Sequence, residues 1–386
     1  MSVYQSFKNG GVLNPPEWLR SVSNGGRSIL DTLLKRGGAS QASLSNLLEL
    51  SQPSVARLVG GFHNDGLVRL SERPPVGRGN PSVQVTLNPD HAYSMGFGIV
   101  GDAISVALID LSGAVRASGA VAMPSMRRDL VKSQAVALKH QAIKAAKIDP
   151  KRIVGAGVGF SGFFVGDPPR FNPPVQLEDW GEVDVAAELS EPLDMAVLCE
   201  NDGTASAVAE SLLGVGRECS NFAYCHLTNG FGGGIIVNGK PLRGALGNAG
   251  DFGGILWMLD EGYPSLENLR EYVLRAGGTD TGVEDMVRRI DADSPGVSEW
   301  IEAAKVPIGK LAFLLGHILA PERVVIGGRL PMSVARELAK AIVIPSTPIR
   351  NNAPFPLPRI VPSQVEGDAS ALGAAAMPLQ ELFFVR

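Results

Sequence analysis

The segment 228–234, TNGFGGG, has a composition that could hold a phosphate group. Its glycines are Gly230, Gly232, Gly233 and Gly234. Glycine lets backbone N–H groups point at an anion and lets the chain approach it closely. Glycines also suit a tight hairpin, and a single glycine run is weak evidence for either. Both interpretations stay open on these residues alone.

A second candidate lies at Asn201 and Asp202, which end an apolar run and precede a helical pattern. An aspartate at the end of a strand can accept a proton from a sugar hydroxyl as a general base. A neighbouring asparagine can orient adjacent hydroxyls. Either residue is also a good helix N-cap, so a structural role is the alternative.

These residues belong to a region, from Tyr93 onward, in which strand and helix patterns alternate. Polar or glycine-rich residues repeatedly follow the strands, as at residues 200–202 and at Gly327 and Gly328. Such alternation predicts an α/β body that presents ligand groups at its strand ends.

The region before Tyr93 predicts three amphipathic helices, in segments 27–38, 40–50 and 51–68. Ser40 and Ser51 are the expected N-caps of the second and third helices. The second helix is expected to bury Leu44, Leu47 and Leu48. The third carries an i, i+3, i+4, i+7 stripe made of Val55, Leu58, Val59 and Phe62.

The third helix leaves Gln52, Ser54 and Arg57 on the side opposite its apolar stripe. Segments 68–70 and 83–87 alternate like hairpin strands, and Arg78 lies in the loop between them. This order predicts a winged helix-turn-helix that reads double-stranded DNA with the third helix in the major groove and Arg78 near a minor groove. A small packing module without DNA contact is the alternative.

Composition limits the remaining classes of function. A chain of 386 residues predicts two or three domains, and a net charge of −4 argues against a general polyanion binder. The first 90 residues hold nine Lys/Arg and six Asp/Glu, against 26 and 33 in the remainder. A mildly basic front on an acidic body is a weak indication of a DNA-binding end.

Three separate cysteines, Cys199, Cys219 and Cys225, lie in apolar surroundings without metal-ligand spacing. They indicate a reducing compartment. The uncharged stretch 311–321 is too short to span a bilayer, and no signal peptide is evident. We therefore expect a cytoplasmic protein with no membrane partner.

Taken together, these motifs resemble the ROK family of repressors and sugar kinases, within the actin/hexokinase-like superfamily. The resemblance rests on GRGNPSVQVTLNPDHAYSMGFGI at the join, ENDGTASAVAE after the strand, the glycine loop, and GDASALGAAAM near the end. It implies an N-terminal winged helix-turn-helix followed by a two-lobed, ribonuclease H-like α/β body. The resemblance covers nearly the whole chain from about residue 24.

The resemblance assigns roles to the candidate residues. Asn201 and Asp202 correspond to a sugar ligand and to the catalytic base of the kinases, and Asp251 corresponds to a sugar-binding glutamate. The glycine loop corresponds to a phosphate-contacting turn, here a vestigial one, with Gly327 and Gly328 grouped with it.

The chain also departs from the kinase pattern. Gly98 and Asp102 replace the Asp and Thr of the Asp-x-Gly-Gly-Thr phosphate turn, and Gly254 replaces a histidine that serves sugar and zinc. An anionic Asp102 would repel a nucleotide phosphate. The cysteine-rich zinc loop is replaced by a segment without cysteine, so no zinc and no other cofactor is expected.

Three functions follow from these observations. The favoured one is a ligand-responsive transcriptional repressor of carbohydrate metabolism that senses a sugar or sugar derivative in a degenerate kinase cleft. The second is an active ATP- and magnesium-dependent sugar kinase, with Asp202 catalytic. The third is a DNA-binding protein whose body is purely structural.

We expect a DNA-binding domain at residues 1–89, a smaller lobe at 90–198 plus 365–386, and a larger lobe at 199–364. The sugar cleft should lie where the lobes meet. The expected partners are operator DNA, the effector, and further copies of the chain in a homodimer or a dimer of dimers.

Overall fold

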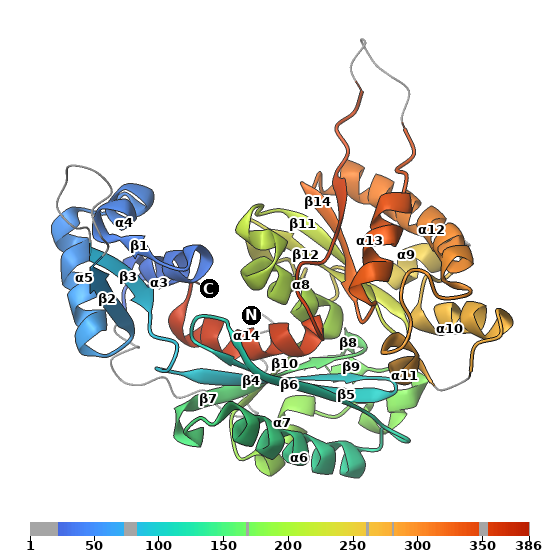
Figure 1. Ribbon diagram of the computed structural model, residues 1–386, viewed down its shortest axis with the longest axis horizontal. Coiled ribbons are helices and arrows are strands. Elements are labelled where there is room, and N and C mark those ends of the chain that lie inside the picture. The colour runs from blue at the N-terminus through green and yellow to red at the C-terminus, as the bar shows by residue number, and fades with distance from the viewer. Residues whose placement is uncertain are drawn as a thin grey trace.

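The computed structural model describes residues 22–72, 83–166, 170–259, 262–279, 282–346 and 354–385. A winged helix-turn-helix begins the described chain and lies beside a two-lobed α/β body (Figure 1). Arg78, in the expected wing loop, falls outside the described residues.

The N-terminal module contains three helices and a small sheet. The helices are α3 (Asn24–Arg36), α4 (Gln41–Leu48) and α5 (Gln52–Asn64). Strands β2 (Val68–Glu72) and β3 (Val83–Leu87) form the expected antiparallel hairpin. A short additional strand, β1 (Ala39–Ser40), pairs with β3 on its other side.

The helix boundaries follow from local capping. Ser40 and Ser51 accept hydrogen bonds from the backbone N–H groups of the first turns of α4 and α5, as expected. Gly37 ends α3 with a φ of 68°, a left-handed conformation that favours glycine. The expectation for Leu47 was wrong: its side chain is 43% exposed, because the short α4 buries only the edge that carries Leu44.

The two lobes of the body contain sheets with the same plan. The first sheet has the order β10-β7-β4-β5-β6, made of β10 (Val197–Asn201), β7 (Ile153–Phe160), β4 (Tyr93–Val100), β5 (Ala103–Asp110) and β6 (Val115–Ala122). The second has the order β13-β12-β11-β14-β15, made of β13 (Lys240–Pro241), β12 (Phe231–Val237), β11 (Phe222–Leu227), β14 (Arg323–Gly328) and β15 (Arg359–Pro362). Each sheet joins an antiparallel three-stranded meander to two parallel strands.

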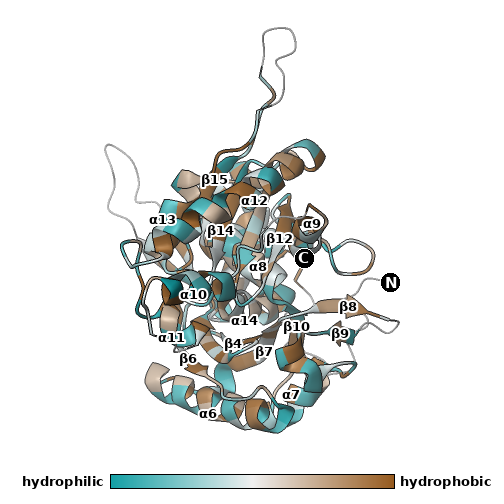
Figure 2. Ribbon diagram, turned by 90° about the vertical axis from the view of Figure 1, so that its right-hand side faces the viewer, coloured by the Kyte–Doolittle hydropathy of each residue, from teal (hydrophilic) through white to brown (hydrophobic). Residues whose placement is uncertain are grey.

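Helices cover both faces of each sheet. Helices α6 (Arg128–Ala146) and α7 (Val185–Leu193) pack on the outer face of the first sheet. The outer face of the second sheet packs against α9 (Phe252–Met258), α10 (Leu266–Arg275), α12 (Val297–Ile318) and α13 (Met332–Ala341). Figure 2 shows largely hydrophobic strands beneath helices that carry both hydrophobic and hydrophilic residues.

Two helices fill the space between the sheets. Helix α8 (Asp202–Leu213) packs on the second sheet and α14 (Ala369–Phe383) on the first, and the two contact each other. Their backbones approach so closely that a Cβ added at Gly373 would lie 1.7 Å from the Ala205 carbonyl oxygen. Small residues along both helices permit this contact.

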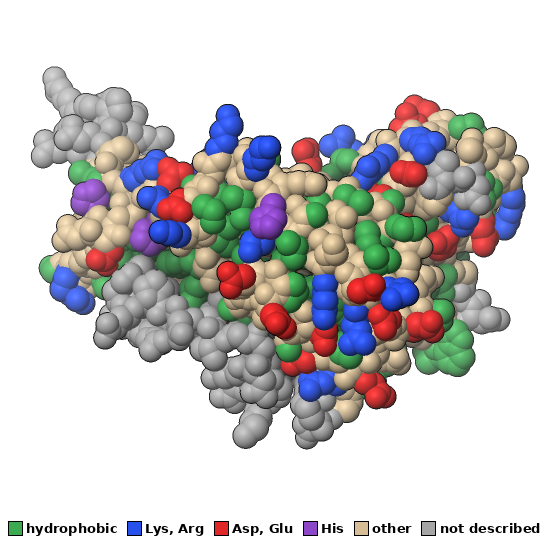
Figure 3. Space-filling view, turned by 90° about the horizontal axis from the view of Figure 1, so that it is seen from below, with side chains coloured by type: hydrophobic (Ala, Val, Ile, Leu, Met, Phe, Trp, Pro, Cys, Tyr) green, Lys and Arg blue, Asp and Glu red, His purple; other side chains and the backbone are tan. Residues whose placement is uncertain are grey.

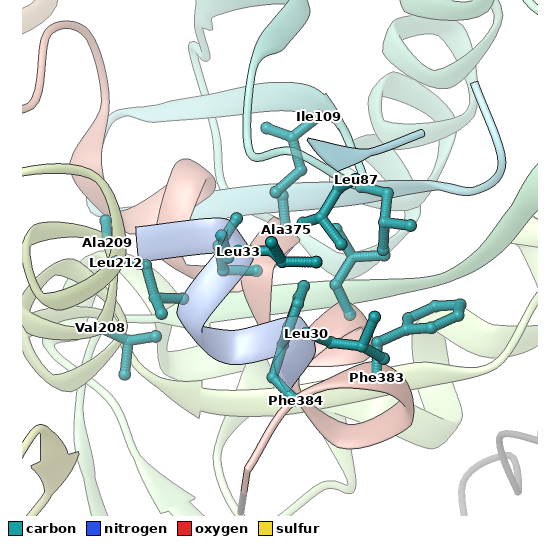
Figure 4. Packing of buried hydrophobic residues seen from close by; sticks show 14 of the residues in the cluster. Leu30, Leu33, Leu87, Ile109, Val208, Ala209, Leu212, Ala375, Phe383 and Phe384 are labelled. Atoms are coloured by element: carbon teal, nitrogen blue, oxygen red, sulfur yellow. The ribbon is translucent and has the colours of Figure 1, made fainter. Parts of the chain in front are cut away.

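Helix α3 packs against this central helix pair. Leu30 and Leu33 belong to the same buried cluster as Leu212 and Phe383 (Figure 4). The guanidinium of Arg27 donates hydrogen bonds to the carbonyl oxygens of Glu381 and Phe384. The DNA-binding module is therefore packed on the body.

Three short elements complete the body. Strands β8 (Phe163–Val165) and β9 (Arg170–Asn172) form a hairpin, and α11 (Val283–Val287) lies near β6. The expected lobe boundary at residue 198 falls inside β10, which pairs with β7 along its whole length. Residues 199–201 therefore belong to the sheet of the first lobe.

Candidate functional site

A cavity of about 500 Å³, called here the cleft, lies at the N-terminal end of α8. Asn201, Asp202 and Asp251 all line it, although they come from different segments of the chain. The turn between β11 and β12 and the β8–β9 hairpin supply other walls. The three residues expected to bind sugar are thus brought together.

Asp202 lies on the floor of the cleft and is buried. Its carboxylate accepts a hydrogen bond from the Ser161 hydroxyl and another, of 2.9 Å, from the backbone N–H of Gly203. Nε2 of His226 lies 3.6 Å from Oδ2 of Asp202, at ion-pair distance if the imidazole is protonated. Asp202 is therefore held in one orientation.

The pKa of Asp202 is lower than its ordinary value of 3.8. Burial on its own would raise the pKa, but His226 and the hydrogen bonds from Ser161 and Gly203 stabilise the carboxylate and outweigh burial. Asp202 is therefore an anion at neutral pH, able to accept hydrogen bonds from ligand hydroxyls.

Asn201 has the helix-capping role that its sequence position also allowed. Its Oδ1 accepts a hydrogen bond of 3.0 Å from the N–H of Thr204, and its Nδ2 donates to the Gly162 carbonyl oxygen at 2.8 Å. Capping and lining the cleft are compatible, because the amide joins α8 to the loop after β7.

Asp251 stands at the mouth of the cleft, immediately before α9. Its side chain is exposed and makes no hydrogen bond or ion pair with another described residue. The preceding loop is fixed by Asn248, whose amide bonds both the N–H and the carbonyl of Phe164 at 2.7 and 2.8 Å. Asp251 therefore stands on a fixed loop, and its carboxylate is free to contact a ligand.

The glycine loop forms the tight hairpin that joins β11 to β12. Gly232 and Gly233 pair with His226 and Cys225 across the ladder. A Cβ at Gly233 would lie 2.3 Å from the Phe252 ring, and one at Gly234 would lie 2.7 Å from the Ala207 Cβ. Packing against α9 and α8 therefore accounts for these two glycines.

The other glycines expected near a phosphate lie in two places, at the cleft and at the end of β14. Gly230 and Gly232 line the cleft with no atom within 4 Å of an added Cβ. Gly327 and Gly328 end β14 outside the cleft, and the N–H of Gly328 donates to the Tyr224 hydroxyl at 2.7 Å. Whether any of them contacts a phosphate stays a prediction.

Asp102 forms an ion pair between the lobes. Its Oδ1 lies 2.8 Å from Nη1 of Arg329, which is almost completely buried. Arg329 also pairs with Glu284 and donates to Oδ1 of Asn229 at 2.9 Å. The spacing of these residues in the sequence gave no indication of this network.

Gly98 lies close to the carboxylate of Asp368. A Cβ at this position would be 2.5 Å from the Ser105 hydroxyl and 3.2 Å from the Asp368 carboxylate. Asp368 already accepts a hydrogen bond from Ser105 and caps α14. An aspartate at position 98 would meet like charge, so the missing kinase residue has no ready place here.

His226 lines the cleft, although no sequence motif singled it out as a ligand residue. It is the last but one residue of β11 and follows an apolar run, yet it lines the cleft. Both ring nitrogens are buried without a hydrogen-bond partner among the described residues. A single polar residue inside a strand was the only sequence signal, and because β11 is buried along its whole length that signal does not reveal which of its side chains borders a cavity.

The described residues contain no group of three or more His, Cys, Asp or Glu side chains arranged to hold a metal ion. Gly254 lines the cleft. Within the described part of the chain, no helix has both the length and the apolar run that crossing a membrane requires.

The expected DNA-reading face lies on α5. Gln52 and Arg57 are exposed, whereas Ser54 is half-buried and its hydroxyl lies 2.8 Å from that of Ser51. On the face of the molecule that carries α6 and α7, acidic and basic side chains are interspersed (Figure 3). Arg128 there lies near Asp179, and Lys132 pairs with Glu188.

Comparisons with known proteins agree with this architecture. The ROK family model matches residues 94–381. The uncharacterized protein y4fQ of Sinorhizobium fredii is 26% identical over 95% of this chain and 93% of its own length. The xylose repressor of Bacillus subtilis is 24% identical over 58% of each chain, so that match spans little more than half of the repressor.

Solved structures share the fold. A ROK family transcriptional regulator, a homologue of the E. coli MLC protein, superposes with a TM-score of 0.64 at 21% identity, covering 93% of this chain and 96% of its own. A ROK family glucokinase from Streptomyces griseus, in complex with glucose and AMPPNP, has a TM-score of 0.59 at 20% identity and covers 74% of this chain and 99% of its own.

Proposed function

Because this chain belongs to the ROK family, we propose that it is a sugar-responsive, DNA-binding transcriptional repressor of carbohydrate metabolism. The observation that carries the proposal is the packing of the DNA-binding module on α8. The first residue of α8, Asp202, lines the cleft. One helix therefore links a ligand site to a DNA-reading module.

DNA binding is supported by the winged helix-turn-helix and by the exposed N-terminal part of α5. A helix of this kind enters the major groove with the residues of its first turns towards the base edges. We propose that Gln52, Ser54 and Arg57 contact DNA there and that Arg78 reaches a minor groove. A homodimer would read two half-sites about 34 Å apart, one helical turn of DNA.

A sugar effector is supported by the polar cleft and by the names of relatives. Xylose repressors and an N-acetylglucosamine repressor of Escherichia coli match part of this chain. Asp202, Asp251 and neighbouring amides can form paired hydrogen bonds with adjacent hydroxyls. We propose no metal or other cofactor, and a cytoplasmic location where the operator DNA lies.

Coupling between the sites follows from the path of α8. Its twelve residues span about 18 Å at 1.5 Å per residue. Asp202 faces the cleft at one end, while Val208, Ala209 and Leu212 join the buried cluster of α3 near the other (Figure 4). A ligand that closes the lobes would move α8 against α14, and α3 with it.

An active sugar kinase is the alternative, and one observation favours it: Asp202 is ionised and lines the cleft, as a catalytic base requires. The contacts of Asp102 and Gly98 oppose it, because both positions lie against other charged side chains. ADP release measured with ATP, magnesium and a panel of sugars separates the two, and we expect none above background.

The experiment that tests the proposal uses two cleft variants. Operator fragments are first selected from random double-stranded DNA with the purified chain. Asp202→Asn and Asp251→Ala should retain this DNA affinity but lose the effect of sugar, because each removes acceptors for hydroxyls. Calorimetry measures sugar binding and gel shifts measure DNA binding. Loss of DNA binding in both variants, or an unchanged sugar effect, would contradict the proposal.

A further inference from the structure

His226 projects from β11 into the floor of the cleft. Its side chain is only 3% exposed, and neither Nδ1 nor Nε2 has a hydrogen-bond partner among the described residues. A buried polar group without a partner costs free energy, so such groups in native proteins are nearly always paired. The position of His226 on the cleft wall makes a bound ligand the natural partner.

Asp202 and Ser161 surround the position that such a ligand would reach. Nε2 of His226 lies 3.6 Å from Oδ2 of Asp202, beyond a normal hydrogen bond, and Oδ2 already accepts from Ser161. An imidazole nitrogen can donate to or accept from a hydroxyl, depending on its tautomer. A ligand hydroxyl beside Asp202 could therefore satisfy His226 without breaking an existing bond.

The charge of the cleft limits what else the ligand can carry. Asp202 and Asp251 line it, and no lysine or arginine does so among the described residues. The nearby Arg329 pairs with Asp102 and Glu284, and Arg243 pairs with Glu200. A phosphate group would meet two carboxylates here without a cation to offset them.

The N-terminus of α8 offers an anion little compensation. The N–H of Gly203 donates to the Asp202 carboxylate, and the N–H of Thr204 donates to Asn201. The helix end is thus capped by side chains of the chain itself, one of them anionic. The backbone groups that commonly bind phosphate at a helix end are occupied.

We propose that the cleft selects an unphosphorylated, uncharged sugar and that His226 contacts one of its hydroxyls and determines specificity. This inference rests on the proposed sugar-sensing function and adds the chemical class of the effector. The sugar would satisfy both Asp202 and His226 at the floor of the cleft, while Asp251 binds it at the mouth.

The test compares neutral sugars with their phosphate esters on the full chain. The probes are D-xylose, D-glucose and N-acetyl-D-glucosamine, with glucose 6-phosphate and N-acetylglucosamine 6-phosphate as the charged counterparts. Calorimetry should give a dissociation constant at least tenfold lower for a neutral sugar than for a phosphate ester. Equal or tighter binding of an ester would overturn the proposed effector class.

The role of His226 is tested with His226→Phe, which keeps a ring of similar shape but removes both nitrogens. Affinity for the neutral sugar should fall tenfold or more, whereas the melting temperature of the ligand-free chain should fall only modestly, because the Asp202 carboxylate loses the imidazole beside it but keeps its hydrogen bonds from Ser161 and Gly203. His226→Gln, which keeps hydrogen-bonding groups, should lose less affinity, and it carries the test if the phenylalanine variant fails to fold. His140→Phe, the same change at an exposed site on α6, should alter neither quantity.

Two further outcomes separate this inference from the proposed function. Unchanged sugar affinity in both His226 variants would show that the histidine is only a core residue, and the sensor would stand without it. A wild-type chain that selects DNA but binds none of the neutral or phosphorylated probes would contradict sugar sensing itself, and the inference with it.

Discussion

Asp202 joins three roles in one side chain: it begins α8, it lines the cleft, and it is buried as an anion. Its pKa lies below 3.8 in the folded chain, so its contribution to stability is complete above that value and is lost as pH falls through the lower, folded pKa. We expect the stability difference between wild type and Asp202→Asn to shrink as pH drops below about 4. Urea unfolding at several pH values measures it, and a difference that grew on acidification would contradict the assignment.

Arg329 forms an almost completely buried ion pair that joins the two lobes. Removing it leaves Asp102 and Glu284 without their shared cation in a largely buried place. We expect Arg329→Met to lower the free energy of unfolding by about 3–5 kcal/mol, the usual effect of breaking a buried ion pair on one side.

The control for Arg329 is a double-mutant cycle with Asp102→Asn, measured by urea unfolding. The combined loss should be smaller than the sum of the single losses, because the second change relieves unpaired charge. Additive losses would show that the two side chains do not interact in solution.

At the scale of residues, the sequence predicted which candidate residues line one cavity, but it did not predict the ion-pair and hydrogen-bond partners of the other side chains. Asn201, Asp202 and Asp251 do line one cavity, because strand ends of an α/β fold converge. The partner of Asp102 lies 227 positions away, and no local pattern links the two. Both faces of β11 are buried, so only the folded sheet shows that the side chain of His226 borders the cleft.

Helix α5 is the element expected to read DNA, and Arg57 is its exposed cation. Arg57→Ala should weaken operator binding by about 1–3 kcal/mol if its guanidinium contacts a guanine. Arg127→Ala removes the same charge from the exposed N-terminal end of α6 and should have little effect. A gel shift that finds equal affinities for wild type and both variants would remove α5 from the interface.

The contact between α8 and α14 is the second prediction at the scale of elements. An added methyl group at Gly373 would collide with the Ala205 carbonyl, so Gly373→Ala should destabilise the chain by about 1–3 kcal/mol. In an exposed helix, replacing glycine by alanine raises the free energy of unfolding by about 1 kcal/mol. A decrease at Gly373 would therefore indicate the close contact between the two helices. Gly119→Ala, where nothing lies within 4 Å, is the control for thermal unfolding.

Elements were the level that the sequence predicted best. The serine caps and the Gly37 stop act locally, so the three N-terminal helices could be placed. Leu47 was misplaced because periodicity does not reveal how much of a short helix its neighbours cover. The boundary expected at residue 198 falls inside β10, because β10 completes one sheet while the helix that follows it packs on the other.

For the whole molecule, two sheets of the same plan enclose a helix pair, and the DNA-binding module packs against that pair. This arrangement places the ligand and DNA-reading ends on one connected core. Linkage requires that a ligand which changes DNA affinity is itself bound with altered affinity when DNA is present. The coupling can therefore be measured either as the effect of sugar on DNA affinity or as the effect of DNA on sugar affinity.

The most direct measurement is the affinity of the purified chain for its selected operator with and without a saturating neutral sugar. We predict that sugar changes the dissociation constant by tenfold or more, about 1.4 kcal/mol, and that Asp202→Asn abolishes the change without altering sugar-free binding. Equal operator affinity with and without a sugar that calorimetry shows to be bound would contradict the central claim, as would release of ADP in proportion to sugar consumed.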